Sequence, residues 1–465
     1  MGVAIAFLGF YGYFIFNIQE EKMIPGWGRQ NEKVTWQFGF RTMKVLLISA
    51  NTEKITMTIL PLGVACVAAA TRKSGHDVAM LDLLVEKDTP SVLRETIEGF
   101  NPDIIGISVR NIDDQNMENP RFLLEKAREI VARCRSLSKA KIVLGGAGYS
   151  IFPEDALSFL GADMGIQGEG EVAFPALIAR MERNANLSGV SGLYLPGGGL
   201  QCKRQFAKNL DSLPLPDPDL WSLPSQKEEL WMPVQARRGC PLNCSYCSTG
   251  AIEGRVIRKH SPEAIVRWIA RWREAGIHQF VFVDNIFNLP PSHAKKICRR
   301  LIDHGLDIKW WSILYPKQVD EELVELMGMA GCEQVSMGFE SGSEPILKNM
   351  KKRFTLKEVR QISGMLSDRG IRRMGFLLLG SPGETRESVE ESLIFADSLK
   401  LESMKITVGV RIYPKTLLAK KAVDEGVISS RDDLLSPRFY LAKGLKDWLP
   451  KILKSWMTTR PHWMI

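Results

Sequence analysis

The stretch VQARRGCPLNCSYC, residues 234–247, joins a short strand-like run to three closely spaced cysteines. These cysteines, Cys240, Cys244 and Cys247, have the spacing C-x3-C-x2-C. The run at 234–236 is typical of a buried strand. We therefore expect the three thiols on the loop that leaves the carboxyl end of that strand.

Five more strand-like runs follow the cysteines and are separated by segments of helix length. Ser261-Pro262 begins one of these helices, and Thr355 with Glu358 forms a capping box at the start of another. Regular alternation predicts parallel strands covered by helices, here a partial (β/α)6 barrel of the TIM type. In such barrels the loops after the strands carry the chemistry. The six predicted strands are 234–236, 280–283, 311–314, 334–339, 375–379 and 406–410.

A second α/β alternation precedes the cysteines. It predicts a doubly wound, Rossmann-like sheet of about five parallel strands, with a ligand site beyond their carboxyl ends. Four prolines between residues 211 and 224 disfavour helix and central strand, and so mark a link between the two domains. The predicted organisation is 1–42, a leader or peripheral segment of unknown role; 43–200, the first domain; 201–230, a proline-rich linker; 231–426, the barrel; and 427–465, a C-terminal extension.

Composition indicates a globular enzyme in a reducing compartment. The 465 residues are 45% hydrophobic and 25% charged, and the net charge of +8 is spread without a polybasic run, so no nucleic-acid partner is predicted. Five of the eight cysteines are scattered and do not form a secreted disulfide framework. We therefore predict a cytoplasmic location.

Two terminal segments leave membrane association open. Residues 3–16 are apolar but shorter than the roughly 20 needed to span a bilayer. They are either a peripheral anchor or a leader outside the fold. Residues 445–465 combine three tryptophans with basic residues, which fits either a lid packed on the barrel or a peripheral contact with a membrane or lipid.

Three thiolates on one loop can ligate three irons of a [4Fe-4S] cube and leave the fourth iron open. A structural zinc site usually needs four protein ligands, and His260 is the nearest candidate for the fourth. The trio resembles that of the radical S-adenosylmethionine (radical SAM) superfamily, and the resemblance covers about residues 231–426. It implies that Cys240, Cys244 and Cys247 are the cluster ligands and catalytic residues, and that S-adenosylmethionine binds the open iron.

The same resemblance implies further contacts to S-adenosylmethionine, each with a plainer alternative. Tyr246 is expected near the adenine. Asp284 either contacts the cofactor amino group or orients its loop. The remaining implied contacts are Ser336 and Glu340 to the ribose or methionine part (or solvated loop groups), Gly380 to adenine through its backbone (or a simple turn), and Arg258 to the carboxylate (or a surface arginine).

Residues 43 to about 185 resemble the cobalamin-binding domain that precedes the barrel in one group of these enzymes. Glycines at strand ends allow a corrin to approach the backbone closely. The D-x-H-x-x-G motif for a lower cobalt ligand is absent, and His76 is expected to be exposed in a helix-to-strand turn. The implied cobalamin-binding residues are Gly63, Ser108, Gly145, Gly146, Gly168 and Glu169.

Together these resemblances imply an enzyme that uses a [4Fe-4S] cluster, S-adenosylmethionine and cobalamin to methylate an unactivated carbon of a lipid or natural-product-type substrate. Electrons would come from a low-potential donor such as flavodoxin or ferredoxin. Two alternatives remain: a cobalamin-dependent radical cyclase or rearrangement enzyme without methyl transfer, and a non-catalytic sensor that holds cobalamin and an Fe-S cluster. A methylthiotransferase is less favoured, because no second cysteine trio is present.

Overall fold

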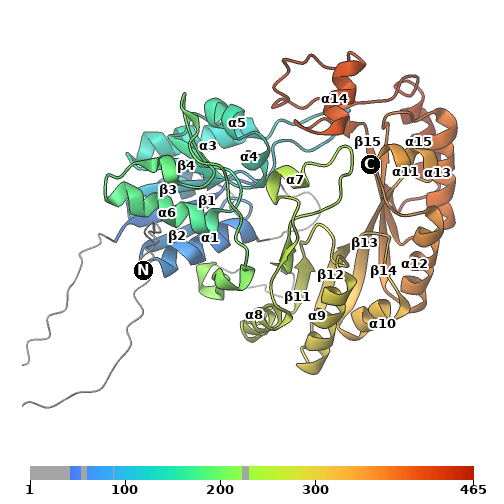
Figure 1. Cartoon of the computed structure of the whole chain (residues 1–465), viewed down its shortest axis with the longest axis horizontal. Coiled ribbons are helices and arrows are strands. Elements are labelled where there is room, and N and C mark those ends of the chain that lie inside the picture. Colours follow the sequence, from blue (N-terminus) through green and yellow to red (C-terminus); the bar gives the residue numbers. More distant parts are fainter. Residues whose placement is uncertain (1–41, 54–59, 87, 222–229) are drawn as a thin grey trace, which may run out of the picture. The chain divides into compact units, whose positions relative to one another are not determined.

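The computed structural model describes residues 42–53, 60–86, 88–221 and 230–465 (Figure 1). The predicted leader, 1–42, lies outside the described residues except for its last residue. Residues 41–465 form one compact unit. Within that unit the two predicted α/β sheets are both present.

The first sheet has seven strands in the order β2-β1-β3-β4-β5-β6-β7. Its first five strands are parallel, as predicted, because helices connect them. The antiparallel hairpin of β6 and β7 was not predicted. The strands are β1 (Lys44–Ser49), β2 (Asp77–Asp82), β3 (Ile104–Ser108), β4 (Lys141–Gly145), β5 (Met164–Ile166), β6 (Leu193–Leu195) and β7 (Gly199–Leu200).

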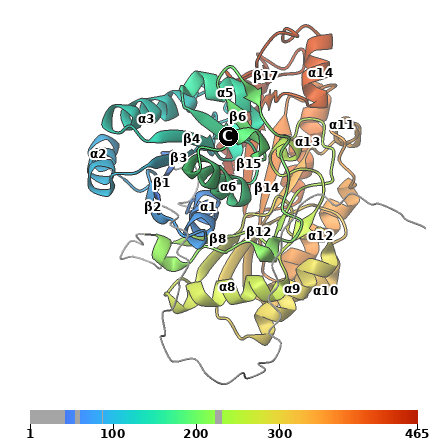
Figure 2. The same ribbon diagram turned by 60° about the vertical axis from the view of Figure 1, so that its left-hand side comes forward.

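Helices cover both faces of this sheet. Helices α1 and α6 pack against each other, and α3 packs against both α2 and α5. Figure 2 shows α2 and α3 on one side of the strands and α1 and α6 on the other. The helices are α1 (Leu62–Lys73), α2 (Thr89–Phe100), α3 (Leu124–Leu137), α4 (Ala147–Ile151), α5 (Pro153–Leu160) and α6 (Gly170–Glu182). The doubly wound prediction is therefore confirmed.

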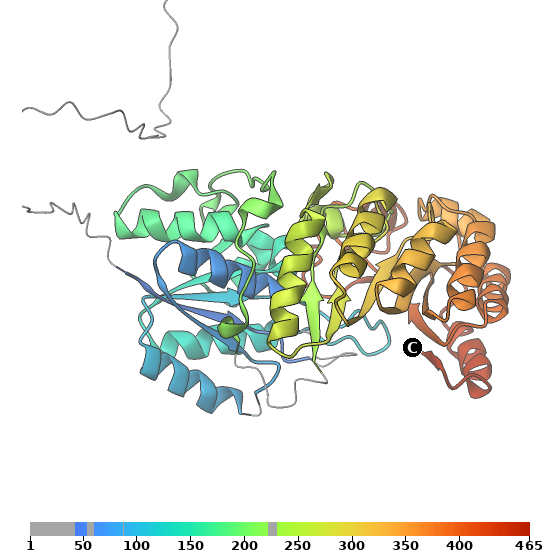
Figure 3. The same cartoon turned by 90° about the horizontal axis from the view of Figure 1, so that it is seen from below.

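The second sheet has seven parallel strands in the order β18-β15-β14-β13-β12-β11-β8. Six of them are the predicted barrel strands, and Figure 3 shows their helices in a curved row outside them. The strands are β8 (Trp231–Val234), β11 (Gln279–Phe282), β12 (Lys309–Leu314), β13 (Cys332–Glu340), β14 (Arg372–Leu379), β15 (Ser403–Val408) and β18 (Trp463–Met464). The barrel helices are α7 (Thr249–Ile252), α8 (Pro262–Glu274), α9 (Pro291–Asp303), α10 (Glu321–Met329), α11 (Glu344–Asn349), α12 (Leu356–Asp368), α13 (Arg386–Ser398) and α14 (Leu417–Asp424).

Two local predictions about the barrel have clear outcomes. The Thr355–Glu358 capping box begins α12 as predicted. The first strand, by contrast, ends at Val234 rather than at Ala236. Arg237 and Arg238 instead form β9 (Arg237–Arg238), which pairs antiparallel with β10 (Arg258–Lys259). This short ribbon turns the chain out of the barrel before the cysteines.

The C-terminal extension completes the edge of the barrel sheet. Its strand β18 pairs with β15, and it follows α15 (Leu449–Thr458). The Trp456 and Trp463 rings stack with centroids 5.8 Å apart, and Trp463 is buried. The sequence left a packed lid and a membrane contact open, and these contacts agree with the packed arrangement. Among the described residues, no helix combines the length and hydropathy required to cross a bilayer.

Candidate active site

The cysteine loop, residues 239–248, leaves β9 through a glycine that no other residue can replace without strain. Gly239 has φ +86°, and a Cβ atom there would lie 2.1 Å from the carbonyl oxygen of Val256. Cys240 next to it is buried, Cys244 is partly buried and Cys247 is exposed. The loop thus runs from the protein interior to an open surface.

Backbone hydrogen bonds tie the loop to three separate segments. The Cys240 N–H donates to the Gly254 carbonyl at 3.1 Å. The Ser245 N–H donates to the Met350 carbonyl at 3.0 Å, and the Ser245 carbonyl accepts from Leu418 at 2.9 Å. Because these anchors follow different barrel strands, the shape of the loop depends on the whole barrel.

The donor set of the loop fits an iron–sulfur cluster. Burial raises the pKa of the Cys240 and Cys244 thiols, and the neighbouring cysteines raise it further. Bound iron would offset this mutual repulsion, since a metal ion stabilises the thiolate form. No group of three or more His, Cys, Asp or Glu side chains within the described part of the chain is arranged to hold a single metal ion.

Asp284 holds the backbone just before the cysteine loop. Its Oδ1 accepts hydrogen bonds from the backbone N–H groups of Ala236 and Arg237, both at 2.9 Å. Burial raises the pKa of this carboxyl to about 7, and Oδ2 has no hydrogen-bond partner among the described residues. Of the two roles predicted for Asp284, these contacts favour the one that orients the loop.

Tyr246 and Glu340 meet at a lysine that sequence reasoning missed. The Lys352 Nζ lies 3.1 Å from the Glu340 Oε1 and 5.4 Å from the centroid of the Tyr246 ring. Glu340, at the end of β13, has φ +64°. Burial would lower the pKa of Lys352, but Glu340 and Tyr246 outweigh that effect and raise it. A buried cation therefore stands beside the cysteine loop. Ser336 lies half-buried on the same strand as Glu340.

Gly380 lies in a tightly held turn after β14. Its φ is +100°, and a Cβ atom would lie 2.5 Å from the Cδ1 of Leu441. Glu384 Oε2 accepts the N–H groups of both Gly380 and Ser381. Burial raises the pKa of Glu384 to about 7. The turn that was predicted to meet adenine through its backbone is thus held by a nearly buried carboxyl.

Arg258 is not the surface arginine that was the plainer of the two alternatives predicted for it. It is buried rather than on the surface, and the carboxylate it meets is the chain's own Glu169, with which it forms an ion pair. Its Nη2 also donates to the Glu253 carbonyl at 2.8 Å. Because β10 pairs with β9, the side chain is directed to the first domain instead of the cysteine loop.

The six residues predicted to bind cobalamin all line one cavity of about 370 Å³. We call it the strand-end cavity. It lies at the carboxyl ends of β1, β3 and β4, where ligands bind in doubly wound sheets. The barrel side of its wall includes Gln235, Arg238 and Glu253. The predicted residues on the wall are Gly63, Ser108, Gly145, Gly146, Gly168 and Glu169.

Two glycines of the cavity wall differ in their surroundings. Gly146 has φ +100°, and a Cβ there would lie 2.5 Å from the Val109 carbonyl oxygen, so the backbone packing at this position requires glycine. Gly63 has no atom within 4 Å of a Cβ position, so the wall is open there. A cavity at strand ends with six glycines in its wall fits a broad, flat ligand such as cobalamin.

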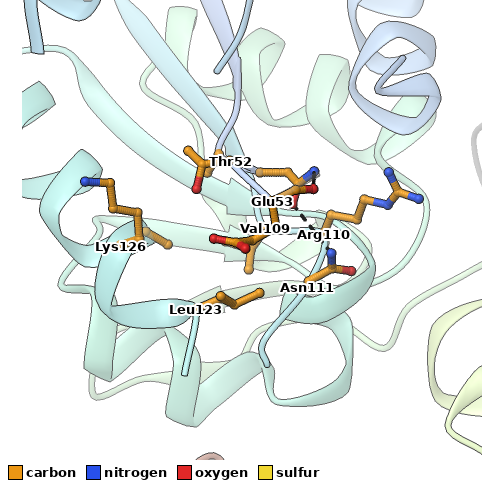
Figure 4. A pocket seen from close by; sticks show the side chains of 10 residues that line it. Thr52, Glu53, Val109, Arg110, Asn111, Leu123 and Lys126 are labelled. Atoms are coloured by element: carbon orange, nitrogen blue, oxygen red, sulfur yellow. Dashed lines mark hydrogen bonds between the residues drawn. The ribbon is translucent and has the colours of Figure 1, made fainter. Parts of the chain in front are cut away.

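A second recess lies beside the ends of β1 and β3, lined by Thr52, Asn111 and Lys126 (Figure 4). Glu53 on its wall is paired with Arg121 at 2.8 Å. The recess has a volume of about 10 Å³, close to the minimum for one water molecule. It is therefore too small to bind a cofactor.

His76 lies in the turn between α1 and β2, as predicted, but the prediction that it is exposed was wrong. Its side chain is only 7% exposed, and Nδ1 lies 3.8 Å from Glu182 of α6. Glu182 is more than a hundred positions away in the sequence, so local sequence gave no sign of this cover. The contact turns the imidazole toward α6.

Four charged residues, Glu169, Glu171, Arg238 and Arg258, connect the strand-end cavity with the cysteine loop, and we call them the charge cluster. The Arg238 Nη2 donates to Glu171 at 2.6 Å, and Nη1 lies 3.4 Å from Glu169. All four side chains are about nine-tenths buried or more. Sequence analysis assigned no role to Glu171 or Arg238.

Comparisons with known proteins agree with this geometry. The model of the radical SAM superfamily matches residues 234–396, and that of the B12 binding domain matches residues 48–178. An uncharacterised methyltransferase of Pyrococcus horikoshii is 29% identical over 401 residues, which cover 83% of this chain and 85% of that protein. The tryptophan 2-C-methyltransferase of Streptomyces laurentii is 22% identical over 81% of this chain and 74% of its own length.

A solved structure shows the same fold over almost the whole chain. It is the radical S-adenosylmethionine methyltransferase TsrM from Kitasatospora setae with cobalamin and a [4Fe-4S] cluster bound, and its TM-score is 0.80. It covers 91% of both chains at 19% identity. The two family models, the cysteine loop and the glycine-lined cavity lead to one assignment: this chain is a radical SAM enzyme with a B12-binding domain, and belongs to the cobalamin-dependent, methyltransferase-like group of that superfamily.

Proposed function

We propose that this enzyme transfers a methyl group from S-adenosylmethionine to an unactivated carbon of a lipid or natural-product-type substrate. The main support is that one cavity wall contains the six predicted cobalamin-binding residues together with Gln235, Arg238 and Glu253, which hold the cysteine loop. A carbon acceptor is proposed because the similar Streptomyces laurentii protein is named as a 2-C-methyltransferase.

When bound, the [4Fe-4S] cluster supplies the electron that cleaves one S-adenosylmethionine, and cobalamin carries the methyl group taken from another. Cys240, Cys244 and Cys247 would hold the cluster. Asp284 keeps the strand-to-loop junction in place through its two N–H contacts. These residues supply position, while the cofactors supply the reactivity.

The residues beside the loop are proposed to hold S-adenosylmethionine against the cluster. We assign Tyr246 and the Gly380 turn to the adenine, and Ser336 and Glu340 to the ribose or methionine part. Lys352 holds the Glu340 side chain in place, because the Lys352 Nζ lies 3.1 Å from the Glu340 Oε1. Arg258 has no assignment to S-adenosylmethionine, since Glu169 engages it.

The proposed reaction balances with two molecules of S-adenosylmethionine and two electrons per turnover. One S-adenosylmethionine loses its methyl group and becomes S-adenosylhomocysteine. The other takes an electron and yields methionine and 5′-deoxyadenosine, which receives the hydrogen removed from the substrate carbon. We propose that a low-potential flavodoxin or ferredoxin supplies both electrons.

The test is anaerobic incubation of the reconstituted enzyme with S-[methyl-²H₃]-adenosylmethionine and fractionated cell metabolites, including lipids. The proposal predicts a product that carries the labelled methyl group. A product without label, formed together with 5′-deoxyadenosine, would instead indicate a radical cyclase or rearrangement enzyme. No consumption of S-adenosylmethionine in any fraction would indicate a sensor. The control is the same protein with Cys240, Cys244 and Cys247 changed to Ala.

A further inference from the structure

The charge cluster lies between two sites that each need a fixed geometry. Glu169 and Glu171 belong to the turn that begins α6, and both line the strand-end cavity. Arg238 also lines that cavity and stands two residues before Cys240. A single ion pair, from Glu171 to Arg238 at 2.6 Å, therefore spans from one site to the other.

The electrostatics of the pair show that it is strongly held. Burial would raise the pKa of Glu171, but Arg238 outweighs that effect and the pKa lies below its ordinary value. The pKa of Arg238 lies above its ordinary value. Burial alone would lower it, but the nearby Glu171 carboxylate outweighs that effect. Both groups therefore stay charged. Removing Arg238 would leave Glu171 buried without its partner, and removing Glu171 would leave Arg238 with only the longer contact to Glu169, at 3.4 Å.

A chain of hydrogen bonds links Arg238 to the start of the cysteine loop. The Arg238 Nε donates to Gln235 at 2.9 Å, and the Gln235 side chain donates to Glu253 at 3.1 Å. Glu253 in turn accepts the N–H of Gly239 at 3.0 Å. Gly239, with its φ of +86°, directly precedes Cys240. The three side chains of this relay, those of Gln235, Arg238 and Glu253, all line the cavity wall.

We infer that the charge cluster couples the two sites, so that a corrinoid in the strand-end cavity and iron in the cysteine loop strengthen each other's binding. A corrinoid that covers the wall would exclude water from the Glu171–Arg238 pair and restrict its motion, since ion pairs strengthen as water leaves. A restricted Arg238 would fix Gly239 and Cys240. This inference rests on the proposed function for the identity of the two ligands, and makes Glu171 and Arg238 positioning residues.

Thermodynamic linkage between the two binding sites gives a test that does not require catalytic turnover. If corrinoid binding favours the loaded cysteine loop, iron loading must favour corrinoid binding by the same factor. The measurement is the Kd for hydroxocobalamin, by equilibrium dialysis, of full-length protein with and without its reconstituted iron–sulfur cluster. The expected ratio of the two constants is about fivefold or more, at the lower end of coupling between linked sites.

Variants then locate the coupling. E171Q should bring the ratio close to one, while R238K, which keeps the charge, should retain part of it. The matched control is D113N, because Asp113 and Arg411 form an equally buried ion pair between the same two halves of the chain, at 2.7 Å, that does not contact the cysteine loop. D113N should keep the ratio of the unaltered protein.

Thermal unfolding of each variant shows whether it is folded, and E169Q replaces E171Q if the latter does not fold. A ratio of one in the unaltered protein, or an unchanged ratio in E171Q, would overturn the inference. Both results are independent of the proposed function, which is tested by product formation. An enzyme that methylates but shows no coupling would refute only the inference.

Discussion

The strand-end cavity has six glycines in its wall, whereas the cysteine loop is held by side chains that bond its backbone. In the cavity, Gly63 leaves space in the wall. At the loop, Asp284 and Glu253 accept N–H groups of residues just before Cys240. The difference follows from the ligands: a broad corrin needs open wall, and a compact cluster needs three thiols fixed in place.

The largest effect is expected from removing the thiols. In the variant C240A/C244A/C247A, reconstituted iron should fall from about four atoms per chain to nearly none, because a [4Fe-4S] cube depends on cysteine thiolates. Formation of 5′-deoxyadenosine should be abolished. Hydroxocobalamin should still bind, about fivefold more weakly by the coupling argued above. Iron analysis, chromatography and dialysis measure the three quantities.

The control for that variant is C202A, since Cys202 lies outside the cysteine loop and is free. It should keep both iron and S-adenosylmethionine cleavage. Continued cleavage in the triple variant would show that the loop is not the cluster site.

The next largest effect concerns the Asp284 carboxyl, which holds the backbone just before the cysteine loop. The pKa of Asp284 is about 7 in the folded chain, against about 3.9 when unfolded. The folded state therefore holds the proton more tightly, and this stabilisation is present at low pH and lost as pH rises through about 7. D284N keeps the acceptor oxygen but cannot ionise. Between pH 5 and 8 the unaltered protein should lose roughly 3 kcal/mol of unfolding free energy that D284N does not lose.

Urea unfolding of cluster-free protein at the two pH values measures this difference. Parallel pH dependence in both proteins would mean that Asp284 does not hold the proton in the folded chain. The result bears only on the loop, because Asp284 is absent from the wall of the strand-end cavity.

A smaller effect is expected when the open cavity wall is filled. G63L places a side chain where nothing lies within 4 Å, so the fold should tolerate it. Hydroxocobalamin affinity should fall about tenfold, equivalent to ~1.4 kcal/mol. G99L is the matched control, because Gly99 is also helical and also has nothing within 4 Å, but lies outside the cavity. Equal affinities for the two variants would remove Gly63 from the binding wall.

The smallest effect is expected from a surface ion pair that belongs to neither the strand-end cavity nor the cysteine loop. E325Q removes an exposed ion pair with Arg369, at 3.1 Å and with both side chains 49% exposed. Exposed pairs contribute about 0–1 kcal/mol, so the unfolding free energy should change by less than ~1 kcal/mol. Iron content and corrinoid affinity should be unchanged. A large loss in either would mean that distant surface changes disturb the sites.

Local patterns in the sequence predicted most of the fold and named residues that the structure brings together at the two candidate ligand sites. The cysteine trio and the cavity glycines lie in short motifs at strand ends, where alternation of strands and helices already places them. The seventh barrel strand escaped prediction because Trp463–Met464 is only two residues long.

The partners of charged side chains could not be predicted, because they are distant in the sequence. Glu171 and Arg238 are 67 positions apart, and Asp113 and Arg411 are 298 apart. Nothing in the local sequence around Arg258 indicates that Glu169 meets it. The same reason explains why the burial of His76 was not predicted, because the neighbouring Glu182 belongs to a helix that is distant in the sequence. Long-range pairing of this kind depends on how the two halves of the chain pack.

The most direct test of the account is the ratio of two products of S-adenosylmethionine in one anaerobic reaction. S-Adenosylhomocysteine reports methyl donation, and 5′-deoxyadenosine reports reductive cleavage by the cysteine-bound cluster. Methyl transfer to an unactivated carbon predicts equal amounts of both, dependent on added cobalamin and on a metabolite fraction that contains the substrate. Formation of 5′-deoxyadenosine without S-adenosylhomocysteine would contradict the account.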